Sequence, residues 1–307
     1  MTWLIAGFGG LGQEMAQVMR HFPDLKQTPI VALRRHPPRD AATEEATETP
    51  TEKPTPNTQW FSADLTDPST LNLPSGLSHV VYCATPDQRD EANYHLTYEV
   101  GLQNLVQALH QTGNHNARLL FVSSTAVYGA NQAGWLDETS PTEPSGFNGR
   151  VLLRAEQWLL AHWPNALVLR LSGLYGPKRR ALLTRLAQGQ ASVPPSEDYW
   201  ANRIHIHDAA RAVIHLLRQT KCHGIYIGTD STPVPLRTLY RDLAQALGAP
   251  EPQPGPPSPM MGKKRLSNQK LINSGFELEW PDCRRGYAAM IANPPISQSA
   301  NQPISHN

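Results

Sequence analysis

The sequence has few cysteines, little net charge and no long apolar run, and each shortage excludes a class of protein. Its three cysteines in 307 residues are widely separated at Cys83, Cys222 and Cys283. They lack metal-ligand spacing and predict reduced thiols in a cytoplasmic protein. A formal net charge of +1 gives no electrostatic footprint for nucleic acid or an anionic membrane. No run is long enough to span a membrane, and Met1 leads almost directly into an expected strand, so we expect neither membrane attachment nor a cleaved signal.

Two segments are poor in large apolar side chains. Residues 41–57 are rich in Thr, Pro and Glu, and residues 293–307 have the same polar character. Such segments cannot offset the entropy cost of ordering by burial. We therefore expect a flexible insertion at 41–57 and a disordered tail at 293–307.

The strongest pattern present is MTWLIAGFGGLG at the N-terminus, a short apolar run that ends in G-x-G-x-x-G. Gly7 allows a sharp turn, Gly9 leaves room for phosphates, and Gly12 lets the following helix pack closely. The helix N-terminus then favours an anion. The turn, whose remaining residues are Phe8, Gly10 and Leu11, is predicted to bind a dinucleotide; the alternative is a glycine-rich turn without a ligand.

Apolar runs alternate with helical patterns along the chain. Strands are expected at Thr2–Ala6, Pro29–Leu33, Gln59–Ser62, His79–Cys83, Arg118–Val122, Ala166–Leu171 and Gly224–Ile227. Helices are expected near Leu11–His21, Glu91–Thr112, Gly149–His162, Ala181–Gln188, His207–Gln219, Leu236–Leu247, Asn268–Asn273 and Arg284–Ala292. This alternation predicts an α/β fold, a Rossmann-type doubly wound parallel sheet of about seven strands. Ligands of such sheets bind beyond the carboxyl ends of the strands.

The residues after the strands are therefore candidate cofactor ligands. Arg34 and Arg35 follow the second strand, where arginine suits a 2′-phosphate, so NADP(H) is favoured over NAD(H). A solvated surface pair is the alternative. After the third strand, Asp64 is placed to accept from adenine and Leu65 to pack on its ring. After the fourth strand, small residues are expected against the cofactor, namely Cys83, Ala84 and Thr85.

Several motifs occur together in family order: ADLTD at 63–67, FVSSTAVYG at 121–129, LRLSGLYGP at 169–177 and RIHIHDAARAV at 203–213. With the glycine fingerprint they resemble the extended branch of the short-chain dehydrogenase/reductase superfamily, which includes the NAD-dependent epimerase/dehydratases. The resemblance covers about residues 1–290. It implies an NAD(P)-binding domain of residues 1–171 and 204–228, and a small substrate-binding cap of residues 172–203 and 229–292. It also makes a homodimer plausible.

The resemblance implies a catalytic serine at Ser124, with Thr125 as a neighbouring substitute. The family also places a Tyr-x-x-x-Lys pair on the next long helix, in which lysine lowers the pKa of the proton-transferring phenol. Alignment on Glu156 puts Asn148 at the tyrosine position and Leu152 at the lysine position, so the pair is missing.

Other residues are candidates to replace part of that chemistry. Tyr128 is an alternative phenol, and Arg150 is a cation at the start of the helix that lacks the pair. Arg150 is equally well explained as an exposed residue of the first turn. If the family geometry holds, the substrate side includes Tyr175, Arg203, His205 and Arg265. No metal site is expected, because the histidines near Asp208 lack further ligands.

Two functions remain open at this point. The first is an NAD(P)-dependent oxidoreductase or epimerase/dehydratase-like enzyme acting on a small polar, anionic or sugar-nucleotide substrate. The second is a catalytically silent module that senses NADP(H) or serves as a scaffold, which the missing Tyr–Lys pair favours. Both require the nucleotide site.

Overall fold

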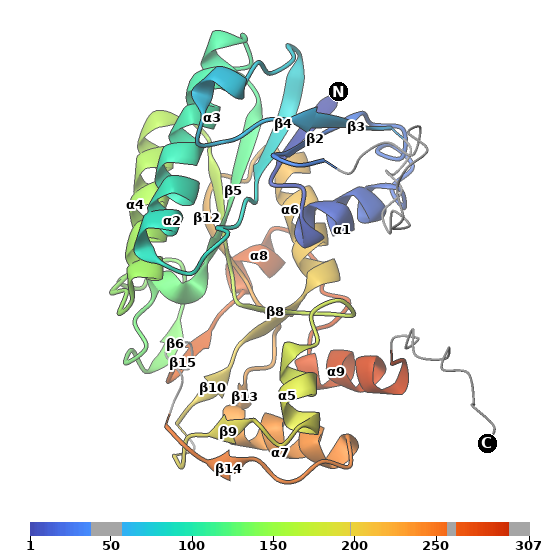
Figure 1. Ribbon diagram of the computed structural model, residues 1–307, viewed down its shortest axis with the longest axis vertical. Helices are drawn as coiled ribbons and strands as arrows, with labels where there is room; N and C mark the ends of the chain where they lie inside the picture. The colour runs from blue at the N-terminus through green and yellow to red at the C-terminus, as the bar shows by residue number, and fades with distance from the viewer. Residues whose placement is uncertain (38–56, 197, 257–261, 295–307) are drawn as a thin grey trace, which may run out of the picture.

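Seven parallel strands form the central sheet of the computed structural model, which describes residues 1–37, 57–196, 198–256 and 262–294 (Figure 1). In order across the sheet they are β3 (Thr58–Ser62), β2 (Ile30–Arg34), β1 (Thr2–Ala6), β4 (Leu77–Tyr82), β5 (Arg118–Ser124), β7 (Leu167–Leu171) and β12 (Gly224–Gly228). The inner strands are apolar because helices cover both faces. The strand order reverses between β1 and β4, and a ligand crevice is expected at such a point.

Helices cover the two faces separately (Figure 1). The helices α1 (Gly10–Met19) and α6 (Ile206–Arg218) pack on one face, and α3 (Gly101–Gln111) and α4 (Phe147–His162) on the other. The short α2 (Glu91–Tyr94) leads into a π-helical turn, η2 (His95–Val100), which continues into α3. π-Helical turns are frequent at functional sites.

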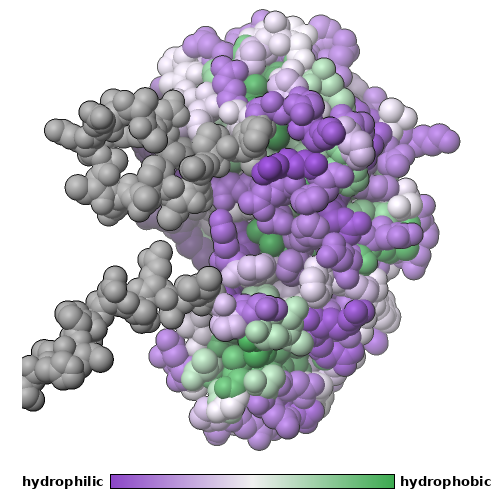
Figure 2. Space-filling view, turned by 90° about the vertical axis from the view of Figure 1, so that its right-hand side faces the viewer, coloured by the Kyte–Doolittle hydropathy of each residue, from purple (hydrophilic) through white to green (hydrophobic). Residues whose placement is uncertain are grey.

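A third apolar core lies beyond the carboxyl ends of the strands, and we call the region built around it the cap. Its main helices are α5 (Ala181–Ala187), α7 (Leu236–Ala246) and α9 (Cys283–Ala292). The remaining short elements of the chain are η1 (Pro68–Thr70), η3 (Thr125–Val127), β6 (Gly134–Leu136), β8 (Gly173–Tyr175), β9 (Ser192–Val193), β10 (Trp200–Ala201), β11 (Arg203–His205), β13 (Val234–Pro235), β14 (Gln253–Pro254), β15 (Lys264–Leu266) and α8 (Gln269–Asn273). Figure 2 shows a mostly hydrophilic face whose hydrophobic residues gather over the cap.

The predicted fold is confirmed. All seven expected strands form the parallel sheet, and all eight expected helices are present with ends shifted by at most two residues. Leu266 and Leu271, in the segment expected to form the cap, pack instead into the two cores beside the sheet. The expected flexible insertion and tail lie outside the described residues, except for Asn57, Asn293 and Pro294.

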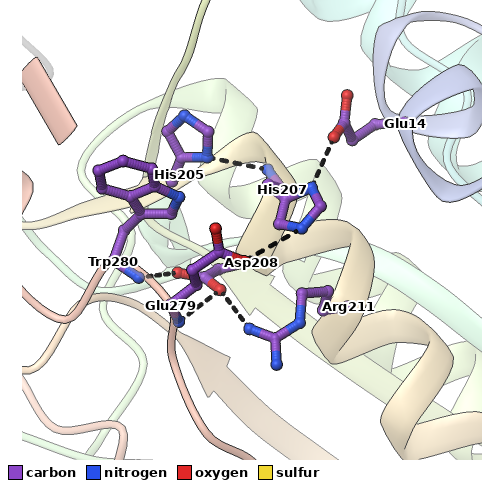
Figure 3. Close-up of polar contacts among 7 residues, drawn as sticks. All are labelled: Glu14, His205, His207, Asp208, Arg211, Glu279 and Trp280. Carbon is purple, nitrogen blue, oxygen red and sulfur yellow. Dashed lines mark hydrogen bonds and ion pairs between the residues drawn. The ribbon is translucent and has the colours of Figure 1, made fainter. Parts of the chain in front are cut away.

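His207 links the first helix to the cap (Figure 3). Its Nδ1 lies 2.8 Å from Glu14 Oε1 on α1, and its Nε2 lies 3.3 Å from Glu279 Oε2, just before α9. The hydrogen bond with Glu14 raises the pKa of His207, and the same contact lowers the pKa of Glu14. A protonated His207 therefore bridges carboxylates from two parts of the fold.

The side chain of Asp208 binds the backbone of the loop that contains Glu279 (Figure 3). Its carboxylate is fully buried and accepts from the amides of Glu279 at 2.9 Å and Trp280 at 2.8 Å. Arg211 Nη1 donates to it at 3.0 Å. His205 Nδ1 caps α6 by accepting from the amide of His207. These bonds fix the start of α6 against the loop that leads into α9.

The contacts of His207 with Glu14 and Glu279 make the stability of the fold depend on pH. We expect His207→Gln to lower the free energy of unfolding by about 1 kcal/mol at pH 6. The unfolded pKa of histidine is near 6.5, so this contribution is fully present below pH 6.5 and is lost as the pH rises through the raised pKa of the folded state. Urea unfolding of both proteins at pH 6, 7.5 and 9 measures the difference, with His223→Gln as the control, since His223 Nδ1 contacts a backbone carbonyl. An equal loss at every pH would contradict the bridge.

Candidate functional site

A cavity of about 560 Å³ opens at the carboxyl ends of the strands, over the point where the strand order reverses. Its walls come from the segments that follow β1, β2, β3 and β4, together with η2, the end of β5, and the chain around β7 and β8. Segments far apart in the sequence thus share one crevice, as the strand-end rule predicts.

Gly7 and Gly12 are fixed by close packing. Gly7 has a φ of +91°, and a Cβ there would lie 2.4 Å from the Cα of Ala84. A Cβ on Gly12 would lie 3.1 Å from Ile5 Cγ2, beneath the helix, and Gly12 is not among the residues that line the cavity. Side chains at these two positions would push β1 away from β4 or α1 away from the sheet.

Gly9 and Gly10 face the cavity, and no side chain covers their backbone. A Cβ on Gly9 would meet no atom closer than 4.0 Å, and no side chain caps the start of α1 at Gly9. The first amides of α1 are therefore available to an anion. Arg179 Nη2 approaches from the other side, 3.8 Å from the place of a Cβ on Gly10. Amides and guanidinium thus face one open space, a donor arrangement that could hold an anion, and Phe8 and Leu11 also line it.

The far end of the cavity is polar and charged. Arg34 lies over the Trp60 ring at 6.0 Å, and Arg35 forms an ion pair with Asp87. Asp64 Oδ1 accepts from the amide and hydroxyl of Thr66, both at 2.8 Å, and Leu65 adds an apolar wall. The predicted residues after β2 and β3 thus line the same end of the cavity.

The segment after β4 lies directly against the glycine turn. Cys83 Sγ donates to the carbonyl of Gly7 at 3.3 Å, and burial raises the pKa of the thiol to about 12. Cys83 therefore packs as a small protonated side chain rather than acting as a nucleophile. Ala84 and Thr85 continue this wall of the cavity.

Two serines end β5 in the cavity wall. Ser124 Oγ accepts from the amide of Ala126 at 3.2 Å, which leaves its own proton available to a ligand. Ser123 donates instead to the buried carboxylate of Glu156, which Arg170 binds through Nε and Nη2. Ser123 is thus held in place, whereas Ser124 retains a donor.

Tyr128 lies behind this wall, outside the set of described residues that line the cavity. Its hydroxyl donates to the carbonyl of Asp137 at 2.7 Å and accepts from Arg170 Nη1 at 2.8 Å. Burial raises its pKa to about 12. The proton of this hydroxyl and its oxygen are therefore both used in structural hydrogen bonds. Thr125 begins η3 and is likewise outside the lining.

The two candidate residues at the start of α4, Asn148 and Arg150, have partners outside the cavity. Arg150 Nη2 lies 3.9 Å from Glu91 Oε2 with both side chains about half exposed, and the Asn148 side chain folds back over Gly146. Neither lines the cavity in the described part of the chain, but Leu152, at the family's lysine position, does.

The predicted substrate residues lie in the cap and its junction with the sheet rather than in the cavity wall. The Tyr175 ring stacks on Tyr287 at 4.4 Å, and His205 packs edge-on against Tyr175 at 5.1 Å. Arg203 Nη1 donates to the carbonyl of Asn202. Arg265 lies between the rings of Trp135 and Trp200 at 5.1 and 4.9 Å.

Sequence reasoning missed several residues that the structure brings to the cavity. Ser172 follows β7 directly, and its buried hydroxyl has no hydrogen-bond partner among the described residues. Tyr98 reaches the cavity from η2, and Asp87 from the segment after β4. Only Ser172 carried a usable signal, its place at a strand end.

Within the described ranges, no group of three side chains suited to a metal ion occurs, and no helix is long and apolar enough to cross a membrane.

Comparison with known proteins gives the family. The family described as "RmlD substrate binding domain" matches residues 4–232. A solved structure from Methylobacillus flagellatus, assigned as an NAD-dependent epimerase/dehydratase, is 32% identical with a TM-score of 0.70, covering 95% of this chain and 97% of its own. UDP-glucose 4-epimerase from Thermotoga maritima, solved with UDP-glucose, shares the fold with a TM-score of 0.75 at 16% identity, covering 95% and 98%.

Two relatives match part of the chain. Protein YeeZ of Escherichia coli K12 is 33% identical over 168 residues, which are 54% of this chain and 59% of YeeZ. dTDP-4-dehydrorhamnose reductase of Mycobacterium tuberculosis is 31% identical over 174 residues, 52% of this chain and 55% of the reductase. These matches span little more than half of each relative. On the family match and the full-length structural relative, the chain belongs to the extended short-chain dehydrogenase/reductase superfamily, in its NAD-dependent epimerase/dehydratase branch.

Proposed function

We propose that this protein binds NAD(P)(H) in the cavity and acts as an oxidoreductase or epimerase/dehydratase-like enzyme on a small polar substrate. One observation carries the proposal: the bare amides at the start of α1 and the guanidinium of Arg179 face the same open space beside Gly9 and Gly10. That space suits a diphosphate, because oriented amides and a cation both favour an anion.

The remaining walls fit the other parts of a dinucleotide. Arg34 and Arg35 lie where a 2′-phosphate would bind, so we propose a preference for NADP(H). Asp64 and Leu65 suit adenine and its ribose. At the other end, the hydroxyl of Ser172, which has no hydrogen-bond partner in the described part of the chain, would bind the carboxamide of the nicotinamide. The nicotinamide would supply hydride chemistry, while the protein supplies position and electrostatics.

The proton chemistry must differ from the family's usual pair. Ser124 keeps a donor for the reacting oxygen, as proposed from the sequence. The phenol that lines the cavity is Tyr98, whose ring lies 6.1 Å from Phe121 on β5. Burial raises the pKa of Tyr98, so its phenol stays protonated and is a weaker acid than a free tyrosine. It would donate a hydrogen bond to the carbonyl oxygen and pass its proton on only as hydride transfer turns that oxygen into a more basic alkoxide. We prefer Tyr98 as the proton donor to Tyr128, whose hydroxyl has two structural partners, and to His205, which lies outside the cavity wall.

The names of the relatives support a sugar-nucleotide substrate. The reductase acts on a dTDP-linked sugar by name, and the epimerase was solved with UDP-glucose. We therefore propose a sugar nucleotide or another small anion.

The second candidate is a catalytically silent NADP(H) sensor or scaffold. The observation that favours it is Leu152, which places an apolar side chain in the cavity at the lysine position. Binding without turnover would be its signature.

The diphosphate site is tested with Arg179→Ala. Because the diphosphate is common to both nucleotides, we expect the affinities for NADPH and NADH to fall together by about tenfold or more. Calorimetric titration measures both. Arg185→Ala is the matched control, an exposed arginine on α5. Unchanged affinity in Arg179→Ala would remove Arg179 from the site, and a wild-type protein that binds neither nucleotide would refute the proposed function.

Turnover distinguishes enzyme from sensor. We expect the wild-type protein to oxidise NADPH with one or more members of a panel of sugar nucleotides and simple carbonyl compounds. Ser124→Ala and Tyr98→Phe should each lower kcat by about 100-fold and leave NADPH affinity within threefold. Tyr94→Phe is the control for Tyr98, since both rings belong to the same aromatic group. Tight NADPH binding without turnover across the panel would favour the silent module.

A further inference from the structure

Asp87 is a charged residue of the cavity wall that the proposed function leaves without a role. Its carboxylate pairs with Arg35, and both residues line the cavity. Asp87 belongs to the segment after β4, and Arg35 follows β2. Their contact therefore joins two walls that are distant in sequence.

The sheet order shows what the ion pair crosses. β1 lies between β2 and β4, so the two chain segments leave the sheet about 10 Å apart, two strand spacings. The glycine turn follows β1 directly, between them. The Arg35–Asp87 pair thus spans the charged end of the cavity beside that turn.

This pair can be displaced. The side chains of Arg35 and Asp87 are 44% and 59% exposed, and exposed ion pairs contribute little to stability. A phosphate offers a guanidinium two parallel charge-assisted hydrogen bonds and carries more charge than a carboxylate. A phosphate at this end of the cavity would compete with Asp87 for Arg35 and would be repelled by the Asp87 carboxylate.

We propose that Asp87 limits the preference of this site for NADP(H), because its carboxylate occupies the guanidinium that the 2′-phosphate requires. The inference rests on the proposed nucleotide site. NAD(H), which has no 2′-phosphate, leaves the ion pair intact. NADP(H) must exchange the carboxylate for its own phosphate. Selectivity is then a difference between an attraction to Arg35 and a repulsion from Asp87.

The proposal predicts that a change at Asp87 alters the affinity for NADPH but not the affinity for NADH. Asp87→Asn keeps the shape of the side chain and removes its charge, so NADPH should bind about three- to tenfold more tightly, within the range expected of an exposed charge pair and a removed repulsion. NADH affinity should stay within twofold. Asp87→Glu keeps the charge and should resemble the wild-type protein.

A double-mutant cycle tests whether Asp87 acts on NADPH affinity by binding Arg35. Arg35→Ala should weaken NADPH binding by at least tenfold and NADH binding by less than threefold. In that background, Asp87→Asn can no longer free a guanidinium and can only relieve repulsion, so the two substitutions should show a coupling free energy for NADPH and none for NADH. Asp24→Asn is the matched control, because Asp24 forms a similarly exposed ion pair with Arg218 on α6.

Calorimetric titration of the full chain with NADPH and NADH, at low and at moderate salt, gives all of these values. If Asp87→Asn leaves NADPH affinity within twofold, or tightens both nucleotides equally, Asp87 does not set the preference and the inference is overturned while the nucleotide site stands. If the wild-type protein binds neither nucleotide, the proposed function fails, and this inference fails with it. Thermal melting of each variant verifies folding, and equal midpoints are expected.

Discussion

The approach of the glycine turn to the segment after β4 is the constraint on which the rest of the site depends. With 2.4 Å between a Cβ on Gly7 and the backbone of Ala84, no side chain fits between the two. The contact lies where the strand order reverses, so Gly7 and Ala84 close the cavity on the side nearest the sheet. It also directs the start of α1 toward open space. Cys83 strengthens the same contact, because its thiol donates to the carbonyl of Gly7.

The fold was predictable from the sequence because its signals are local. Continuous apolar strands, helical periodicity and the glycine fingerprint each reflect short-range geometry, and they agree with one another along the chain. The candidate cofactor ligands after β1 to β4 could also be predicted, since the parallel sheet brings strand ends to one edge. Arg34, Asp64 and Ala84 line the cavity for this reason.

The other side of the site was not predictable in the same way, because it depends on packing between distant segments. Tyr128 follows the family motif, yet its hydroxyl is bound by Arg170 and a backbone carbonyl, which no local pattern announces. Tyr175 and Arg265 lie among aromatic rings of the cap and its junction. Conversely, Tyr98 reaches the cavity from η2, within a segment predicted only as a helix.

The π-helical turn η2 has a consequence for how this chain tolerates change. A π-helical turn holds one residue more than an α-helical one, and each residue of a helix turns the chain by about 100°. Loss of a single residue within His95–Val100 would let the turn become regular and would rotate the side chains of its first residues relative to α3. Leu96, Thr97 and Tyr98 would then no longer all face the cavity. The length of this segment therefore decides which side chains face the cavity, and one deletion here would alter the cavity wall at several positions at once.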